Sequence, residues 1–436
     1  MEFLFIDERG PQESFRVSEP YNKVNKIAYG KDDMHLYVAN VVKIKEVDLA
    51  RVNEKYLKIE ENYYSTRKKL DNSKELKGQK ILERKRFKYG IASMATNDVE
   101  FYKSVFNLMI KYGIENCLFS ISKMALVVDS RLSEWIWNVT ERNKYSPTLL
   151  KYVLTKYAEI ECSEDVIKKL LDKNVGLDAV LYAIQQDLFN IISENNDNKR
   201  MHLQTNSYSE LLELINNTKL TDIVEPERDA SFNWEKFSFP LDLWLLEMYF
   251  SETHPNLSVV LDEGIPVSPF ERFDFHEIKE NEKSEEHVGL RIADVIVAIT
   301  GKYMSKLSVA NKHNLDNPTQ RVQLSSDWFD FNESQFELVK LLSTIIFKED
   351  RKYGYGVDTF FDTSLLFETF IRYISSYDYY TEYKSLTTSE HSDYHFSVLA
   401  EKMGEKWNDS IRYEAMTMGI YGSLKEAIEQ GQYHPL

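Results

Sequence analysis

The chain has 436 residues, and its 54 basic and 70 acidic side chains give a net charge of −16. Hydrophobic residues make up 43% of it, which excludes global disorder, and the acidic total argues against indiscriminate binding to polyanions. The two cysteines, Cys117 and Cys162, form no C-x-x-C motif, and neither a secretory signal nor a long apolar run is visible, so we expect a cytoplasmic protein without disulfides or a membrane partner.

The predicted elements alternate between strands and helices in the first part of the chain. In order, they are strands at 1–6 and 34–44, helices at 46–70, 79–88 and 98–112, a strand at 117–122, a mainly helical stretch at 129–250, strands at 257–261 and 272–280, a helix at 284–303, a loop at 311–332 and helices from 334 onward. This pattern predicts an α/β fold with a large helical insertion and a helical C-terminal extension.

Two apolar strands end on a pair of acids. The opening stretch MEFLFIDERG runs into Asp7 and Glu8, and the later stretch LSVVLDEG runs into Asp262 and Glu263. A carboxylate at the end of a buried strand must be solvated, paired or bound to a cation, because an unpaired buried charge is costly. The simplest interpretation is a strand that meets water at a turn. The alternative is that both acid pairs share one edge of a sheet.

Two further acids extend this second interpretation. Asp294 lies among apolar residues of the predicted helix at 284–303, where an unpartnered charge is unfavourable. Glu75 lies in SKELKG, within a segment (67–88) that holds ten Lys or Arg residues against three Asp or Glu. Such a basic segment is commonly a solvated helix face, but Lys80, Arg84 and Lys85 can also hold a phosphate backbone.

Clustered carboxylates favour a hard divalent cation. Their mutual repulsion raises their pKa values unless a cation binds, and oxygen ligands suit Mg²⁺ or Mn²⁺ rather than Zn²⁺. Two such ions can activate water and stabilise the leaving oxygen of a phosphodiester. Each acid taken alone is more simply a structural or solvated residue, and their spacing in the sequence does not prove that they converge. Together, the acids and the basic segment favour a metal-dependent nuclease.

The order of these motifs resembles that of the domain-of-unknown-function 3800 family. The resemblance rests on FIDERG, ELKG, VVLDEG and S-x5-LRIAD, which cover about 1–122 and 257–303. It implies an RNase H-like mixed sheet flanked by helices, with the core formed by 1–128 and 251–310, a helical insertion at 129–250 and a helical region at 311–436. The resemblance implies that the catalytic and metal-binding residues are Asp7, Glu75, Asp262 and Asp294. It also implies that Glu8 and Glu263 support the metal ligands or serve as alternative ligands, that Lys77 contacts phosphate or orients an acid, and that Ser284 caps the last core helix.

The sequence departs from the family pattern at two arginines. Arg9 stands where the family usually has Ser, and Arg291 stands where Gln is usual. Both add positive charge near the expected site. They can help to hold nucleic acid, or they can neutralise the carboxylates of a site that has lost its metals.

Two functions are therefore expected. The first is a nuclease that hydrolyses DNA or RNA by a two-metal mechanism, with a setting in antiviral defence or a mobile element. The second is a catalytically inactive RNase H-like scaffold, which the net charge of −16 favours. In either case the helical regions are candidates for contact with a protein partner or a second copy of the chain.

Overall fold

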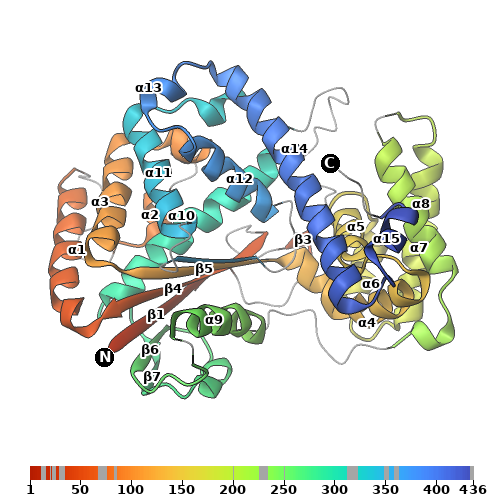
Figure 1. The fold of residues 1–436 in the computed structure, drawn as a ribbon, viewed down its shortest axis with the longest axis horizontal. Helices are drawn as coiled ribbons and strands as arrows, with labels where there is room; N and C mark the ends of the chain where they lie inside the picture. The colour runs from red at the N-terminus through yellow and green to blue at the C-terminus, as the bar shows by residue number, and fades with distance from the viewer. Residues whose placement is uncertain are drawn as a thin grey trace.

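A six-stranded mixed sheet forms the centre of the molecule (Figure 1). The structure, a computed structural model, describes residues 1–10, 16–19, 21, 26–28, 35–66, 76–82, 86–199, 201–224, 234–249, 251–311, 323–347, 353–357 and 363–432. The strands of this sheet are β1 (Glu2–Arg9), β4 (Leu36–Lys45), β5 (Glu115–Ser122), β6 (Leu257–Asp262), β7 (Glu277–Glu282) and β8 (Tyr353–Val357). The short strands β2 (Arg16–Val17) and β3 (Ile27–Ala28) pair separately.

The sheet has the order β7-β6-β1-β4-β5-β8. Strands β1, β4 and β5 form an antiparallel meander, and β6 is added parallel to β1 and β7 parallel to β6. On the other edge β8 pairs parallel with β5. The register places Ile6 beside Leu261 on β6 and Asp7 opposite Asn40 on β4, so the acid that ends the apolar run of β1 lies in the middle of the sheet.

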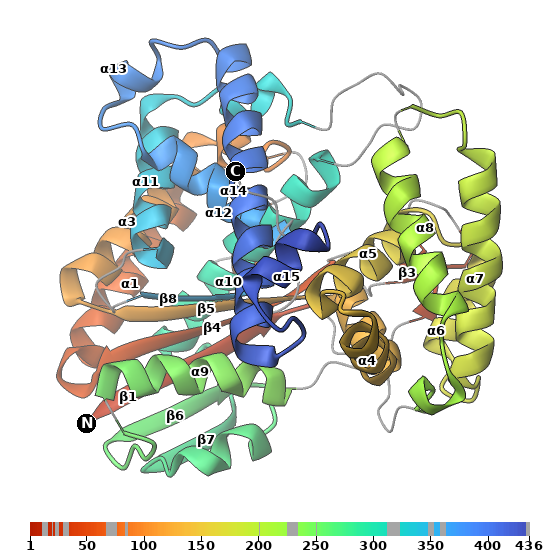
Figure 2. The ribbon, with the colours of Figure 1, turned by 45° about the vertical axis from the view of Figure 1, so that its right-hand side comes forward.

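Helices cover both faces of the sheet (Figures 1 and 2). One face carries α10 (Val288–Ala310), which lies across β1 and β4, and beside it α1 (Glu46–Thr66), α3 (Thr96–Tyr112), α11 (Glu333–Phe347) and α12 (Thr363–Ser375). The opposite face carries α9 (Trp234–Tyr249). The alternation of β1 matches these layers, because Phe5 belongs to the core under α10 and its neighbours Leu4 and Ile6 belong to the core on the other side.

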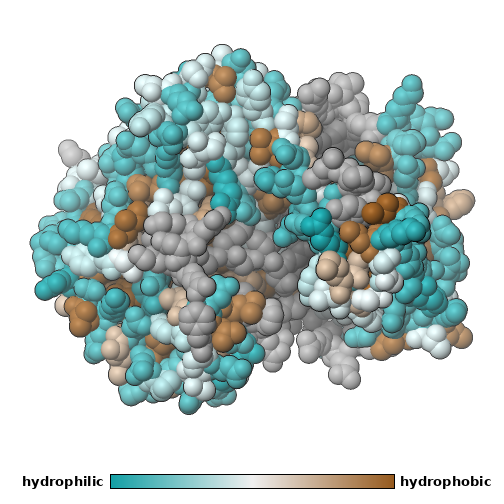
Figure 3. All heavy atoms as spheres, viewed as in Figure 1, coloured by the Kyte–Doolittle hydropathy of each residue, from teal (hydrophilic) through white to brown (hydrophobic). Residues whose placement is uncertain are grey.

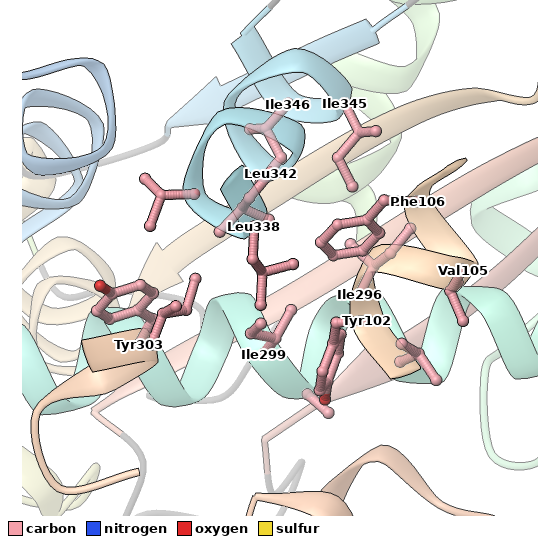
Figure 4. Close-up of a cluster of buried hydrophobic side chains, with 14 of the residues drawn as sticks. Tyr102, Val105, Phe106, Ile296, Ile299, Tyr303, Leu338, Leu342, Ile345 and Ile346 are labelled. Atoms are coloured by element: carbon pink, nitrogen blue, oxygen red, sulfur yellow. The ribbon is translucent and has the colours of Figure 1, made fainter. Parts of the chain in front are cut away.

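The larger core is built where three helices meet over the sheet. Figure 4 shows side chains of α3, α10 and α11 pointing into a common interior, among them Phe106, Ile299 and Leu342, each of which is fully buried. Helix α10 is buried along most of its length, which explains why its sequence is apolar almost throughout. This packing fixes the position of α10 above the sheet.

A group of helices extends beyond one end of the sheet, on the right in Figure 1. It consists of α4 (Lys123–Asn143), α5 (Pro147–Ile160), α6 (Glu164–Leu171), α7 (Leu177–Glu194) and α8 (His202–Asn216). The C-terminal region continues through α13 (Tyr380–Tyr383), α14 (Thr388–Tyr413), a π-helical turn (Glu414–Met418) and α15 (Leu424–Glu429). Its end packs on α5 through a small core that contains Leu149, Ile411 and Tyr421.

The α/β class is confirmed, and the strands and helices that carry strong hydrophobic patterns lie where the sequence predicts them. Three expectations are wrong. Residues 268–273 form a 3-10 helix and β7 begins only at Glu277, the helix expected at 79–88 is described only as the short α2 (Gly78–Ile81), and the C-terminal region contains β8 as well as helices. The surface in Figure 3 is mainly hydrophilic, with apolar side chains scattered across it.

Candidate functional site

Two of the predicted acids, Asp262 and Asp294, act electrostatically on a third, Asp7. Burial of Asp7, which is 4% exposed, and the charges of Asp294 and Asp262 raise its pKa well above the usual value. The backbone N–H of Glu8 and the charge of Lys77 lower it. We call Asp7, Asp262 and Asp294 the acid triad.

The pairing of β1 with β6 explains how two members of the acid triad come together. The printed register ends with Ile6 beside Leu261, and Asp7 and Asp262 are the next residues on the two parallel strands. Phe5 and Val260, two residues earlier, both belong to the core under α10, so alternation puts both carboxylates on that same face. The side chain of Asp262 is partly exposed at the end of its strand.

Helix α10 supplies Asp294 because it lies very close to β1. A Cβ atom on Gly289 would overlap the ring of Phe5, so only glycine permits this approach. Asp294 follows Gly289 by five residues on the same helix, and its charge raises the pKa of Asp7.

The segment before α2 also belongs to the site. The backbone N–H of Gly78 donates to Asp294 Oδ2 at 2.7 Å, and Lys77 Nζ donates to Ser284 Oγ at 2.5 Å. Lys77 is the cation whose charge lowers the pKa of Asp7, so it lies near the acid triad. Ser284 does not cap α10 as we expected, because the helix begins at Val288 with His287 as its N-cap. Glu75, Arg84 and Lys85 lie outside the described residues.

Glu8 and Glu263, which follow Asp7 and Asp262 in the sequence, do not point to the acid triad. Glu8 supplies its backbone N–H to Asp7 Oδ1 at 2.6 Å, but its charge contributes to raising the pKa of Tyr37, after the larger effect of burial. Tyr37 belongs to the core on the other face of the sheet, and strand alternation turns the Glu8 side chain to that face. The prediction that the Glu8 side chain supports the metal ligands is therefore wrong. Glu263 is exposed in the turn after β6.

The arginines differ in their surroundings. Arg291 Nη1 bonds Glu60 at 2.8 Å, Nε donates to the carbonyl of Ser284 and Nη2 to that of Glu285. Its side chain is 11% exposed and joins the start of α10 to α1. Arg291 therefore holds two helices together, in place of the nucleic-acid contact that we predicted. The charge of Arg9, in contrast, lowers the pKa of Tyr102.

Tyr102 marks where Arg9 lies. Burial first, and then the charge of Asp294, raise the pKa of Tyr102, whereas the charge of Arg9 lowers it. Arg9 therefore lies near the acid triad at the end of β1. Lys80 is exposed on α2.

One residue of this region escaped the sequence analysis. Asn40 of β4 lies opposite Asp7 and is fully buried. It interrupts the apolar run LYVANVVKI, and a single amide within a buried strand is the pattern that identifies it.

A second group of possible ligands lies at the start of α10. Glu282, Glu286 and His287 offer atoms that all lie within 4.8 Å of one another, and His287 Nε2 is 2.7 Å from Glu282 Oε2. Among the described residues, the carboxylate oxygens of the acid triad do not meet this spacing, so they do not all lie within 4.8 Å of one another.

Neither a search for membrane spans nor comparison with known proteins identifies a function for this chain. Within the described part of the chain, every helix is too short or too polar to cross a membrane. Comparisons with protein-family models, with curated proteins and with solved structures returned no match.

Proposed function

We propose that this protein is a metal-dependent nuclease with an RNase H-like core. The core proposal is supported by the antiparallel meander β1-β4-β5, its parallel extension through β6 and β7, and the acids at the ends of β1 and β6. The membership of the domain-of-unknown-function 3800 family stays a prediction. The observation that carries the functional proposal is the convergence of three acids from distant parts of the chain. Asp7 and Asp262 follow the paired residues Ile6 and Leu261 on two parallel strands, and both Asp262 and Asp294 act electrostatically on Asp7.

The acid triad is the proposed site of a divalent cation, which would draw together three carboxylates that do not all lie within 4.8 Å of one another. Asp262 and Asp294 both act electrostatically on Asp7, and the charge of the neighbouring Lys77 opposes only part of this effect. Hard oxygen ligands of this kind suit Mg²⁺ or Mn²⁺. In this proposal Asp7, Asp262 and Asp294 hold the metal together with Glu75, which precedes Lys77 by two residues. When bound, the metal supplies an activated water and electrostatic stabilisation of the leaving oxygen of a phosphodiester.

The chain's own residues have supporting roles in this proposal. Gly78 fixes the carboxylate of Asp294 through its backbone N–H, and Glu8 does the same for Asp7. Lys77, with its ammonium group held by Ser284, is positioned to contact a phosphate oxygen beside the acids. Arg9, Lys80, Arg84 and Lys85 are proposed to contact the backbone of the nucleic acid.

A nuclease assay with matched carboxylate variants tests this function. Labelled DNA and RNA, single- and double-stranded, are incubated with the protein in Mg²⁺, Mn²⁺ or EDTA. We expect cleavage only with a divalent cation, and a loss of about 100-fold or more in Asp7→Asn and Asp262→Asn, because each removes a charged ligand. Glu263→Gln is the control, since it changes an exposed carboxylate adjacent to Asp262.

Two results would contradict the proposal. Cleavage that continues in EDTA would show that the acids do not act through a metal. Folded wild-type protein without cation binding or cleavage would favour the inactive scaffold, in which Lys77 serves as the internal counter-charge of the acids. A protein partner, self-association through the helical regions and a role in antiviral defence or a mobile element stay predictions.

A further inference from the structure

Asn40 faces the acid triad from the neighbouring strand. In the antiparallel pairing of β1 and β4 it lies directly opposite Asp7, and residues directly opposite each other point to the same face. Val38 and Val42, two positions before and after Asn40, both belong to the core under α10. The amide of Asn40 therefore lies on the face that carries Asp7, Asp262 and Asp294.

The amide of Asn40 is buried without a hydrogen-bond partner. The residue is 0% exposed, and neither Oδ1 nor Nδ2 forms a hydrogen bond. Burying an unsatisfied polar group costs about 1–3 kcal/mol, so its presence requires an explanation. Its partner on the other side is Leu118 of β5, which is apolar. On the β1 side, the residue directly opposite Asn40 is the polar Asp7.

We propose that the side-chain carbonyl oxygen of Asn40 is a further ligand of the cation at the acid triad, an inference that rests on the metal site proposed above. Amide oxygens are common ligands of hard cations. Directly opposed residues have Cβ atoms about 4.5–5.5 Å apart, so the side chains of Asp7 and Asn40 can reach one ion. A neutral oxygen also adds a ligand without adding to the repulsion among the three carboxylates.

Asn116 provides a matched comparison. It is also an asparagine with 0% exposure, and it lies on β5 opposite Val42 of β4. This pair is two positions along the ladder from the pair of Asn40 and Leu118. Its Nδ2 donates to the carbonyl of Ile345 on α11 at 3.5 Å, whereas its Oδ1 is buried without a hydrogen-bond partner, as that of Asn40 is. Asn116 differs from Asn40 in that it lies opposite an apolar residue, Val42, and not opposite a member of the acid triad. The same substitution at the two asparagines therefore separates a general effect of burying leucine from an effect on the cation.

The test is calorimetric titration with Mn²⁺ combined with thermal unfolding in EDTA. Asn40→Leu should bind Mn²⁺ about tenfold more weakly, while its unfolding temperature in EDTA stays equal or rises because an unsatisfied amide is removed. Asn40→Asp should unfold at a lower temperature in EDTA and bind Mn²⁺ more tightly, because it adds a fourth charge to the same position. Asn116→Leu should leave Mn²⁺ affinity unchanged.

Each outcome decides the inference. Equal Mn²⁺ affinity in the wild type and Asn40→Leu would overturn it and leave the metal site intact. A wild type that binds no Mn²⁺ would overturn both the inference and the proposed site. Weaker binding in Asn40→Leu but not in Asn116→Leu would support it, even if the wild type cleaved no nucleic acid, in which case only the nuclease proposal would fail.

Discussion

Asp7 is the residue at which burial and function oppose each other. Its carboxylate lies in the middle of the sheet, and burial together with the charges of Asp294 and Asp262 raises its pKa. A pKa that is higher in the folded than in the unfolded state means that ionisation of Asp7 weakens the fold as pH rises. Without a cation, the site is therefore a source of instability at neutral pH.

Replacing Asp7 with asparagine should stabilise the metal-free protein. Asparagine keeps an oxygen that can accept the N–H of Glu8 but carries no charge. We expect Asp7→Asn to unfold several degrees above the wild type at pH 8 in EDTA. This advantage should shrink as pH falls and vanish below the usual carboxyl pKa, where Asp7 is protonated in both the folded and the unfolded state. Thermal unfolding across pH measures it, and an advantage that grows as pH falls would contradict the explanation.

Individual residues were predictable from the sequence where their local pattern carried the information. The acids Asp7 and Asp262 follow apolar strands, and Asp294 interrupts an apolar helix, so the cost of burying each charge identified them. Arg291 was not predictable in the same way, because its partner Glu60 lies on α1 and the sequence gives no distance between the two. Strand alternation alone separates Glu8 from Asp7.

At the scale of elements, the contact between α2 and α10 positions the site. A Cβ atom on Gly78 would lie 2.6 Å from Ala298 Cβ and 3.1 Å from the carbonyl oxygen of Asp294. The absence of a side chain at Gly78 thus lets its N–H reach the carboxylate of Asp294. This is a backbone approach that no other residue type permits without a shift.

Gly78→Ala should separate the two elements. We expect a loss of about 1–3 kcal/mol in the free energy of unfolding, the usual cost of overpacking, together with weaker Mn²⁺ binding. Ala298→Gly removes the nearest methyl group but costs about 1 kcal/mol by itself in the middle of a helix. The double variant should therefore lose less stability than the sum of the two single variants, as denaturant titrations can measure. Additive losses would show that the contact is not the cause.

Elements were predictable where hydrophobic pattern and length agreed. Strands β1, β4, β5 and β6 are rich in apolar residues and almost wholly buried, and α1, α3 and α10 have helical composition over many residues. Strand β7 reads EIKENE, is largely exposed and contributes little apolar pattern, so its boundary was misplaced. Strand β8 reads YGYGV, in which two glycines concealed a strand that pairs with β5.

At the scale of the whole molecule, one carboxylate links the C-terminal region to the helices beyond the sheet. Glu414, at the end of α14, is 1% exposed, and its Oε1 accepts the backbone N–H of Thr148 in the first turn of α5 at 3.1 Å. Burial raises the pKa of Glu414, and hydrogen bonds from Ser146 and Thr148 lower it. It therefore acts on α5 as a cap supplied by a distant part of the chain.

Glu414→Ala should loosen this connection. The loss of an acceptor at a helix N-terminus costs about 0.5–2 kcal/mol, and the cost should appear as faster amide hydrogen exchange in α5 and α15. Glu414→Gln keeps the acceptor oxygen without the buried charge and should retain wild-type protection. Equal exchange in the alanine variant and the wild type would mean that the apolar contacts of Leu149 and Tyr421 hold the two regions together unaided.

The pairing of β6 with β1 has a consequence for biosynthesis. The first acid of the triad precedes α1 in the chain, but its two companions leave the ribosome only after all the helices from α1 to α9. Pairing between segments so distant along the chain is slow, because a large loop must close first. A nascent or prematurely terminated polypeptide that lacks β6 and α10 thus holds Asp7 without its two companions, and the negatively charged pocket forms only after both elements have been made.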